Sequence, residues 1–208
     1  MALQYEKVDR RIKRTRQHLK DALISLIKEK KFDSVSVTDI VRQSNINRST
    51  FYAHYQDKEE LMVCIIDELV HGMIQSMYGP SSMNTTFSFQ QNFPATITAE
   101  LFTYVENHAV YFQSIMNNHH DPQLIQRLSD SFYKIFLNEV ESRHSGEQQL
   151  SVNKGFFISY FTSAIIGFIY HWLINTNMKY SPGYTAKELA KLIHLEPCYF
   201  PQVKSDMN

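Results

Sequence analysis

The chain has 208 residues, of which 43% are hydrophobic and 20% are charged, so it can bury a sizeable core in one domain or in two small ones. Six glycines and six prolines are too few for a turn-rich β protein or a low-complexity chain. Two cysteines, Cys64 and Cys198, cannot form a disulfide framework and lack the spacing of zinc ligands. The N-terminus is polar and basic and does not resemble a signal peptide. These features predict a soluble cytoplasmic protein with no metal and no cofactor.

The net charge of zero hides a marked asymmetry along the chain. Residues 1–56 carry 12 basic and 6 acidic side chains, a net charge of +6, whereas residues 57–208 carry 9 basic and 15 acidic side chains, a net charge of −6. Residues 7–20 contain seven basic side chains and a single acidic one, Asp9. A solvated helix face usually interleaves acids with bases. The basic N-terminal part is therefore predicted to meet a polyanion, and nucleic acid is the favoured one.

Hydrophobic periodicity and capping signals predict the first helices. Apolar residues at helical spacing indicate an amphipathic helix over residues 9–31, with lysines at its C-terminal end, where the helix dipole favours cations. Ser36 and Asp39 form an S-x-x-D cap. This cap is expected to open a short helix that ends near Ser44.

The next residues predict a tight turn and two further helices. Asn45 stands where a left-handed turn residue is needed, and asparagine tolerates that conformation. Asn47 is a suitable N-cap for a short helix over residues 48–55. Asp57 is a suitable cap for a long helix that continues to about residue 77.

The remainder of the chain also follows a helical pattern. Residues 78–93 are polar and aperiodic and predict a loop, after which apolar residues recur at helical spacing over 94–115 and 121–140. A long helix is expected over 152–177, and a Thr-x-x-Glu capping box at 185–188 opens a final one. No run of β-branched residues bounded by turns suggests a strand. The sequence therefore predicts an all-α fold.

The run from Phe156 to Ile174 contains no Lys, Arg, Asp or Glu. A membrane span would account for it, but polar residues inside the run and the lack of flanking basic loops argue against one. The alternative is a helix buried between partners, with small residues every fourth position so that another helix can approach closely. We favour this second interpretation, which predicts a homodimer built on the 152–177 and 184–195 helices and no membrane contact. The predicted interface residues are Ser159, Ser163, Gly167, Trp172, Leu189 and Leu192.

The most informative segment is residues 36–61, which read SVTDIVRQSNINRSTFYAHYQDKEEL. Two short helices joined by a tight turn form a helix-turn-helix, in which the second helix lies in the major groove of DNA. Hydroxyls and helix N-termini bind phosphates, and arginine is the commonest reader of guanine. The apolar residues that would fix the angle between the helices are Val37, Ile40, Val41, Ile46 and Phe51.

This segment resembles the DNA-binding domain of the TetR family of transcriptional regulators. The resemblance covers residues 10–62 and rests on the sequence S-T-F-Y-A-H-Y-x-D-K-E-E-L of the third helix. It departs from the family pattern at Asn45, where glycine is usual, and at Ala53, where a larger residue is common, so that position 53 is expected to read few bases. Residues 167–193 are similar to a Gram-positive branch that includes relatives of the dihydroxyacetone-kinase regulators.

The resemblance implies a set of DNA-binding residues. Arg48 and its two neighbours would face the major groove, and Thr38 would approach a phosphate or a base edge. Tyr52, His54 and Lys58 would bind phosphates. The N-terminal arginines would follow the flanking DNA backbone or reach a minor groove. Three members could instead have no contact with DNA: Thr38 could support its helix, Tyr52 could be a half-buried aromatic and His54 could be an exposed bystander. The full set is Arg10, Arg11, Arg14, Thr38, Asn47, Arg48, Ser49, Thr50, Tyr52, His54 and Lys58.

Other candidate sites are weaker. His119, His120 and Asp121 have the residue types of metal ligands, but they look like a helix junction. Aromatic residues at helical spacing could line an effector pocket or form ordinary core; they are Tyr104, Tyr111, Phe112, Phe132, Phe136, Phe157, Tyr160 and Phe161. No glycine-rich phosphate loop or nucleophile–base motif is present, so an enzyme is not predicted.

The resulting prediction is a TetR-type regulator with a DNA-binding domain at 1–56 and an effector-binding and dimerisation domain at 57–208. Its partner is double-stranded DNA with a palindromic operator, and a ligand in the C-terminal domain tunes or releases DNA binding. Repression is favoured, although the sign depends on where the operator lies. The alternative is a regulator or activator whose C-terminal domain binds a partner protein.

Overall fold

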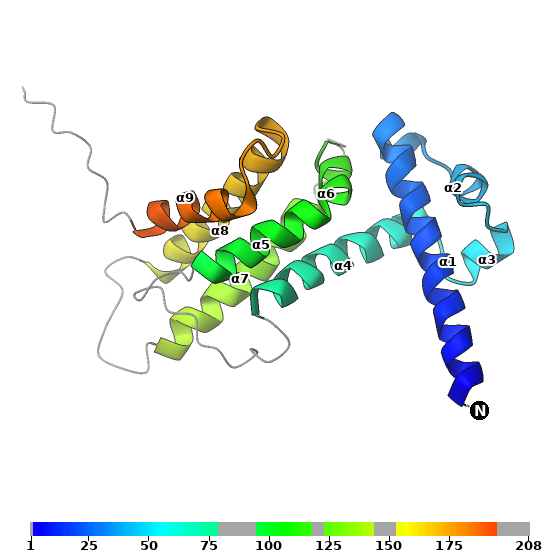
Figure 1. Ribbon diagram of the computed structural model, residues 1–208, viewed down its shortest axis with the longest axis horizontal. Helices are drawn as coiled ribbons and strands as arrows, with labels where there is room; N and C mark the ends of the chain where they lie inside the picture. The colour runs from blue at the N-terminus through cyan, green and yellow to red at the C-terminus, as the bar shows by residue number, and fades with distance from the viewer. Residues whose placement is uncertain (1, 79–94, 118–122, 144–152, 195–208) are drawn as a thin grey trace, which may run out of the picture.

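The computed structural model describes residues 2–78, 95–117, 123–143 and 153–194, and these segments contain helices and no β-strand. The prediction of an all-α fold is confirmed. Figure 1 shows a small group of N-terminal helices at one end of the molecule and a larger group of helices at the other. We call residues 2–56 the head and the described residues from 57 to 194 the body. The predicted histidine–aspartate junction at 119–121 and the predicted loop over 78–93, apart from residue 78, lie outside the described residues.

The head begins with a helix longer than predicted. Helix α1 (Ala2–Glu29) starts before Asp9, because residues 2–8 contain no glycine or proline that would end a helix. Its C-terminal half buries Leu19, Leu23 and other apolar side chains. A short 3₁₀ turn (Phe32–Ser34) then leads out of the helix.

The helix-turn-helix consists of α2 (Val37–Ser44) and α3 (Arg48–Tyr52). Helix α3 is shorter than the predicted 48–55, because the chain turns after Tyr52 to bring Tyr55 into the core. Ile40 and Phe51 are fully buried between the elements of the head. Both belong to the predicted apolar set, whose other members, Val37, Val41 and Ile46, are partly buried against the same core.

A single long helix, α4 (Lys58–Tyr78), connects the head to the body (Figure 1). As predicted, Asp57 caps it: its Oδ1 accepts a hydrogen bond from the backbone N–H of Glu60 at 2.7 Å. The helix packs against α1 at the head end and against α5 (Ala95–Asn107) and α7 (Gln123–Arg143) in the body. The core is therefore continuous from the head into the body along α4.

The body is completed by α6 (Ala109–Met116), α8 (Lys154–Tyr170) and α9 (Pro182–His194). Helix α6 also contacts α1 of the head. Helix α7 packs against α8, and α5 packs against α9. Phe102 on α5 is fully buried and meets the Trp172 ring edge-on, with the centroids 5.2 Å apart. The body is thus held by apolar contacts between segments that are distant in the sequence.

The predicted long helix over 152–177 ends earlier and less regularly. After Tyr170 the helix widens into a π-turn (His171–Asn175), and Asn177 and Met178 take positive φ angles of 48° and 55°. The last helix starts at Pro182 rather than at Thr185. Its first turn is capped by Ser181, whose hydroxyl accepts a hydrogen bond from the backbone N–H of Tyr184 at 3.3 Å. Proline suits the first helical position because its missing N–H is not needed there, so the predicted capping box at 185–188 was wrong.

The segment Lys154–Asn175 is apolar and long enough to cross a membrane by length and composition alone. Within the protein, Ile158, Ile165 and Ile169 point into the body and are buried. Phe156 and Tyr160 lie on the opposite side and are 78% and 69% exposed. The core helices of soluble proteins can be as long and as apolar as this one. Its composition is therefore also consistent with one face packed in the body and one face open to a partner.

Candidate nucleic-acid interface

The helix-turn-helix is held in place by a capping box at the start of α2. The Ser36 hydroxyl accepts a hydrogen bond from the Asp39 N–H at 3.2 Å, and the Asp39 carboxylate accepts one from the Ser36 N–H at 3.0 Å. At the other end of α2, Asn45 takes the left-handed conformation with φ 53° and ψ 39°. Both features confirm the sequence prediction. Asn47 occupies the N-cap position of α3, but no hydrogen bond to its side chain caps the helix.

Asp39 also joins α2 to Lys30, the residue that follows α1. Its carboxylate accepts hydrogen bonds from the Lys30 ammonium at 2.8 Å and from the Arg42 guanidinium at 3.0 Å. The hydrogen bond from Lys30, followed by those from the backbone and hydroxyl of Ser36, holds the pKa of Asp39 well below its usual range. The sequence indicates Asp39 as a capping residue but gives no sign of this ion-pair network, because Lys30 lies in the segment before α2.

The outer surface of α3 presents polar side chains that belong to the predicted DNA-binding set. Asn47, Arg48 and Ser49 are exposed, and so is Thr38 on the neighbouring helix. Tyr52 is 49% exposed, and its hydroxyl accepts a hydrogen bond from Arg48 Nη2 at 3.3 Å. The guanidinium also lies 5.6 Å from the centroid of the Tyr52 ring. Tyr52 therefore orients Arg48 at the surface, an i,i+4 contact that the sequence spacing allows.

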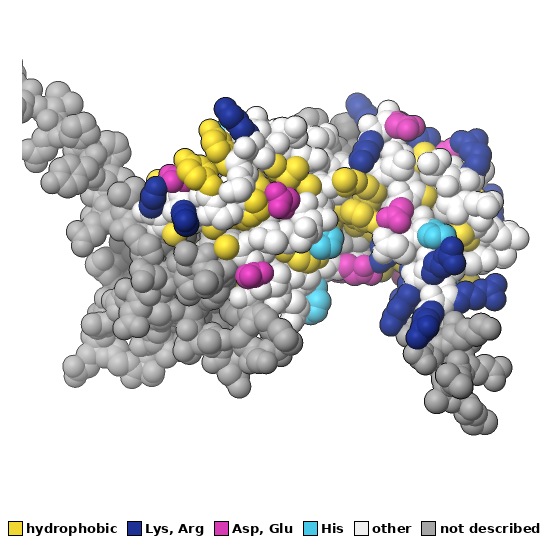
Figure 2. Space-filling model, viewed as in Figure 1, with side chains coloured by type: hydrophobic (Ala, Val, Ile, Leu, Met, Phe, Trp, Pro, Cys, Tyr) yellow, Lys and Arg dark blue, Asp and Glu magenta, His cyan; other side chains and the backbone are white. Residues whose placement is uncertain are grey.

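Two of the other predicted residues are partly covered. Thr50 and His54 are half-buried, and the His54 ring lies 6.3 Å from that of Tyr55. Three arginines farther along α1, Arg10, Arg11 and Arg14, are exposed. Figure 2 shows Lys and Arg side chains gathered over the head, whereas the visible face of the body carries far fewer of them. The charge asymmetry of the sequence is thus also a spatial one.

Lys58 has a structural role that the sequence did not predict. Its ammonium donates hydrogen bonds to the backbone carbonyls of Phe32 at 3.0 Å and Asp33 at 3.1 Å, and it lies 4.7 Å from the centroid of the Phe32 ring. Only 15% of its side chain is exposed. The ammonium therefore joins the start of α4 to the 3₁₀ turn of the head, which leaves little of it for the predicted phosphate contact.

The aromatic residues proposed for an effector pocket divide into three groups. Phe112, Phe132 and Phe136 are fully buried core, and Phe157 and Phe161 pack against that core. Tyr160 lies on the surface. Only two of the eight aromatic residues, Tyr104 and Tyr111, line a described pocket, at the junction of the head and the body. Because helical periodicity cannot separate a pocket wall from a packed core, most of these residues turn out to be ordinary core.

The predicted interface residues also divide. Ser159, Ser163 and Gly167 form an exposed stripe on α8, where a methyl group added at Gly167 would meet no atom of the chain within 4 Å. Leu192 on α9 is exposed as well. Trp172 and Leu189 are buried inside the chain itself, and the Trp172 indole N–H donates to the carbonyl of Tyr180 at 2.8 Å. Their side chains fill the body, so they offer no surface to a partner.

Comparison with known proteins matches both parts of the chain. Residues 19–64 match the family model described as bacterial regulatory proteins, tetR family, and residues 94–195 match the model described as transcriptional regulator C-terminal region. The uncharacterized HTH-type transcriptional regulator YxbF of Bacillus subtilis (strain 168) is 39% identical over 80 residues, which are 38% of this chain. The matched segment spans 21% of that relative's length.

Solved structures of similar fold cover most of the chain. A TetR transcriptional regulator from Streptococcus agalactiae 2603V has a TM-score of 0.64 and 20% identity, covering 91% of this chain and 98% of that one. The dihydroxyacetone kinase operon activator DhaS has a TM-score of 0.58 and 17% identity, covering 86% and 93%. The fatty acid degradation regulator FadR from Bacillus halodurans has a TM-score of 0.58 and 13% identity, covering 86% and 93%. At these identities the structures support the fold.

Proposed function

The chain belongs to the TetR family of bacterial transcriptional regulators, and from this premise we propose that it represses transcription as a homodimer bound to a palindromic operator. The family match supports DNA binding and regulation, and identifies a regulator rather than an enzyme. The observation that carries the rest of the proposal is the surface of α3. It presents Arg48, oriented by Tyr52, on a helix-turn-helix whose own core is closed.

The division of labour follows the predicted boundary. Residues 1–56 would bind DNA, and residues 57–208 would dimerise and respond to a ligand. Within the head, Arg48, Ser49 and Thr50 would contact the major groove. Thr38 would contact a phosphate or a base edge, and Tyr52 and His54 would bind phosphates. The exposed arginines of α1 would bind the flanking backbone, where each neutralised phosphate releases counterions.

Dimerisation is supported by the outer face of α8 and α9. Phe156, Tyr160 and Leu192 are large apolar residues exposed on these helices, which also carry the stripe of small residues at 159, 163 and 167. Large exposed apolar patches mark interaction sites, and small residues let two helices approach closely. A twofold dimer also presents two heads to a palindromic site. We therefore place the dimer interface on α8 and α9, and the protein in the cytoplasm with its DNA.

The proposed response to a ligand depends on the spacing of the two heads. Successive major-groove half-sites lie about 34–36 Å apart, so a modest rotation of the heads removes one of them from register. A ligand shifts this equilibrium only if it binds one arrangement more tightly than the other. The alternative is a body that binds a partner protein, and purification with a bound small molecule would distinguish the two.

Selection from a pool of randomised DNA duplexes tests the proposal. We expect the full-length protein to enrich an inverted repeat, and a promoter carrying that repeat across its start site to be less active when the protein is present. Enrichment of no sequence would contradict specific DNA binding. Increased transcription from the same promoter would contradict repression and leave an activator.

A further inference from the structure

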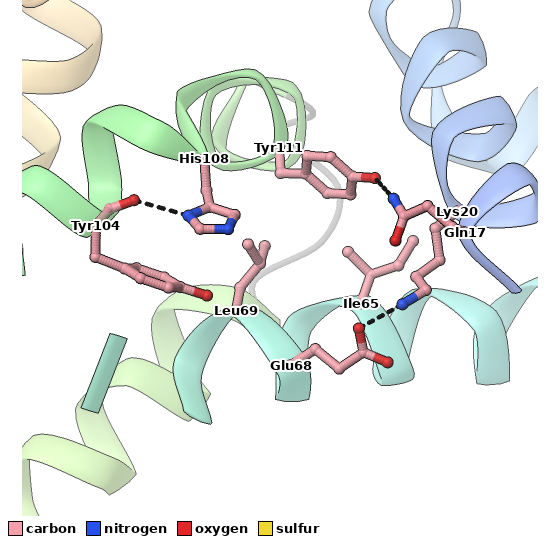
Figure 3. A pocket seen from close by; sticks show the side chains of 8 residues that line it. All are labelled: Gln17, Lys20, Ile65, Glu68, Leu69, Tyr104, His108 and Tyr111. Atoms are coloured by element: carbon pink, nitrogen blue, oxygen red, sulfur yellow. Dashed lines mark hydrogen bonds and ion pairs between the residues drawn. The ribbon is translucent and has the colours of Figure 1, made fainter. Parts of the chain in front are cut away.

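A polar pocket of about 230 Å³ lies between the head and the body (Figure 3). Its walls come from α1 on one side and from α4, α5 and α6 on the other. This volume is smaller than the roughly 300–1,000 Å³ of typical drug-sized ligand pockets, so it suits a small molecule. The residues that line it are Gln17, Lys20, Ile65, Glu68, Leu69, Tyr104, His108 and Tyr111.

The charged groups of the pocket neutralise each other. The Lys20 side chain on α1 is only 10% exposed, and its ammonium forms an ion pair with the Glu68 carboxylate on α4. The Glu68 side chain, in contrast, is 60% exposed. A cation that paired with Glu68 would leave the buried Lys20 ammonium without its partner, which is strongly unfavourable. An anion would have to compete with the Glu68 carboxylate for Lys20, so the pocket favours an uncharged ligand.

The uncharged groups of the pocket offer both donors and acceptors. The Gln17 amide N–H groups donate to Asp21 Oδ1 at 2.9 Å and to the Tyr111 hydroxyl at 2.8 Å, which leaves the amide oxygen as an acceptor. His108 Nδ1 lies 2.9 Å from the carbonyl of Tyr104, an acceptor, so Nδ1 donates its proton there and Nε2 is the ring nitrogen that remains for a ligand.

Tyr104 adds a hydroxyl to this set. Burial raises the pKa of Tyr104, so the hydroxyl stays protonated and can donate. The ring stacks on His108 with the centroids 4.1 Å apart, and the hydroxyl lies against α4 at Gly72. A Cβ at Gly72 would stand 2.1 Å from that oxygen, so the glycine leaves the space that the hydroxyl occupies.

From this lining we propose that the pocket binds a small, uncharged polyhydroxy compound. Hydroxyl groups both donate and accept, and therefore match a mixed set of tyrosine hydroxyl, imidazole nitrogen and amide oxygen. The carbon skeleton of such a compound would lie on Ile65 and Leu69. Because it carries no charge, such a ligand leaves the Lys20–Glu68 ion pair intact.

The place of the pocket gives this ligand a regulatory role, which rests on the proposed ligand-controlled DNA binding. Tyr111 on α6 donates to Asp21 and accepts from Gln17, both on α1, so the pocket borders the contact that holds the head against the body. A ligand that touches Gln17 on one side and Tyr104 on the other binds only one arrangement of the two parts tightly. Differential affinity of this kind couples ligand binding to the orientation of the heads.

Ligand-observed NMR titration of the full-length protein with erythritol and xylitol tests the proposal. We expect saturable binding of a polyol to the wild type and about tenfold weaker binding to Tyr104→Phe, which keeps the ring and removes one donor. Tyr133→Phe makes the same chemical change on the surface of α7, away from the pocket, and is expected to bind as the wild type does. Erythronate, the carboxylate of similar size, is expected to bind at least about tenfold more weakly than erythritol, because its carboxylate has to compete with Glu68 for Lys20.

Three results would overturn the proposal: no saturable binding of either polyol, equal binding by Tyr104→Phe and the wild type, or preference for erythronate. Operator binding without polyol is measured on the same preparations. If the wild type binds operator but no polyol, the pocket proposal fails and the proposed function stands. If it binds a polyol but no operator, the proposed function fails.

Discussion

The head and the body are both helical, but they are held together differently. In the head, contacts between polar groups close in sequence fix the elements, such as the reciprocal Ser36 and Asp39 hydrogen bonds and the left-handed Asn45. In the body, buried side chains such as Phe102 and Trp172 meet across about seventy residues of sequence. Its most exposed apolar residues lie on α8, whereas α3 exposes mainly polar ones.

This difference suits the two regions to different partners, DNA for the head and a second copy of the chain for the body in the proposed dimer. A DNA duplex is read by polar groups that must be held at a fixed angle, so the head uses short helices with well-defined ends. In the proposed dimer a second copy of the chain would be held by apolar area, and one face of α8 is open for it. Changes in the two regions should therefore have different measurable effects.

The largest expected effect is loss of the core of the head. Phe51→Ala removes a fully buried ring, and we expect the free energy of unfolding to fall by about 3–5 kcal/mol, with loss of DNA binding. Urea unfolding followed by circular dichroism measures the change. Tyr52→Phe is the matched control, because it alters the neighbouring exposed ring and should change stability by less than about 0.5 kcal/mol. Equal losses in the two variants would show that α3 is not packed as described.

The next effect concerns the open face of the body. Gly167→Glu places a carboxylate on the stripe of small residues, and an unpaired charge buried in an interface costs about 3–5 kcal/mol, or roughly a hundredfold or more in the dimer Kd. Sedimentation velocity should show monomers at micromolar concentration. Val110→Glu, an exposed position on α6, should leave the dimer intact. A dimeric Gly167→Glu protein would move the interface to another face.

A smaller effect is expected from the DNA-reading surface itself. Arg48→Ala should weaken binding to the selected operator by about 1–3 kcal/mol and affect random DNA much less. Arg14→Ala, a change of the same kind on α1, should weaken operator and random DNA alike and lower the salt dependence by about one phosphate contact. Fluorescence anisotropy at several salt concentrations separates the two. If Arg48→Ala weakened both DNAs equally, Arg48 would be a phosphate ligand.

The smallest effect concerns the cap of α2. Ser36→Ala should lower the free energy of unfolding by about 1 kcal/mol, whereas Ser49→Ala, on the exposed surface, should not. Asp39→Asn gives a pH signature. Because the folded state lowers the pKa of Asp39 from 3.8, its contribution is fully present above that value and is lost as the pH falls through the lowered pKa. The stability difference between wild type and Asp39→Asn should therefore shrink below pH 3.8; a constant difference would contradict the network.

The same contrast explains what the sequence could predict. Caps and turns depend on neighbouring residues, so Ser36, Asn45 and Asp57 were assigned correctly from spacing alone. The exposed residues of α3 followed from the family motif. The structural role of Lys58 was not predicted, because its hydrogen-bond acceptors are backbone carbonyls 25 and 26 residues earlier. No side-chain pattern in the sequence marks such acceptors.

The body was harder to predict in detail. Helical periodicity identified α8, but it did not show that Trp172 turns inward within a π-turn while Tyr160 stays outside. Of the pocket lining, only Tyr104 and Tyr111 were among the predicted residues. The others were missed for a related reason, since Gln17, Glu68 and His108 come from separate parts of the chain and none forms a motif. One signal was available: Lys20 falls among apolar positions of α1, and a buried lysine requires a partner.

Footprinting combined with stoichiometry on the selected operator tests the central claim most directly. The account predicts two protected half-sites related by a twofold axis, with centres a whole number of helical turns apart, and one protein dimer per duplex. Arg48→Ala should lose the two half-sites together. A single protected site occupied by one chain, or protection that does not depend on sequence, would contradict the account.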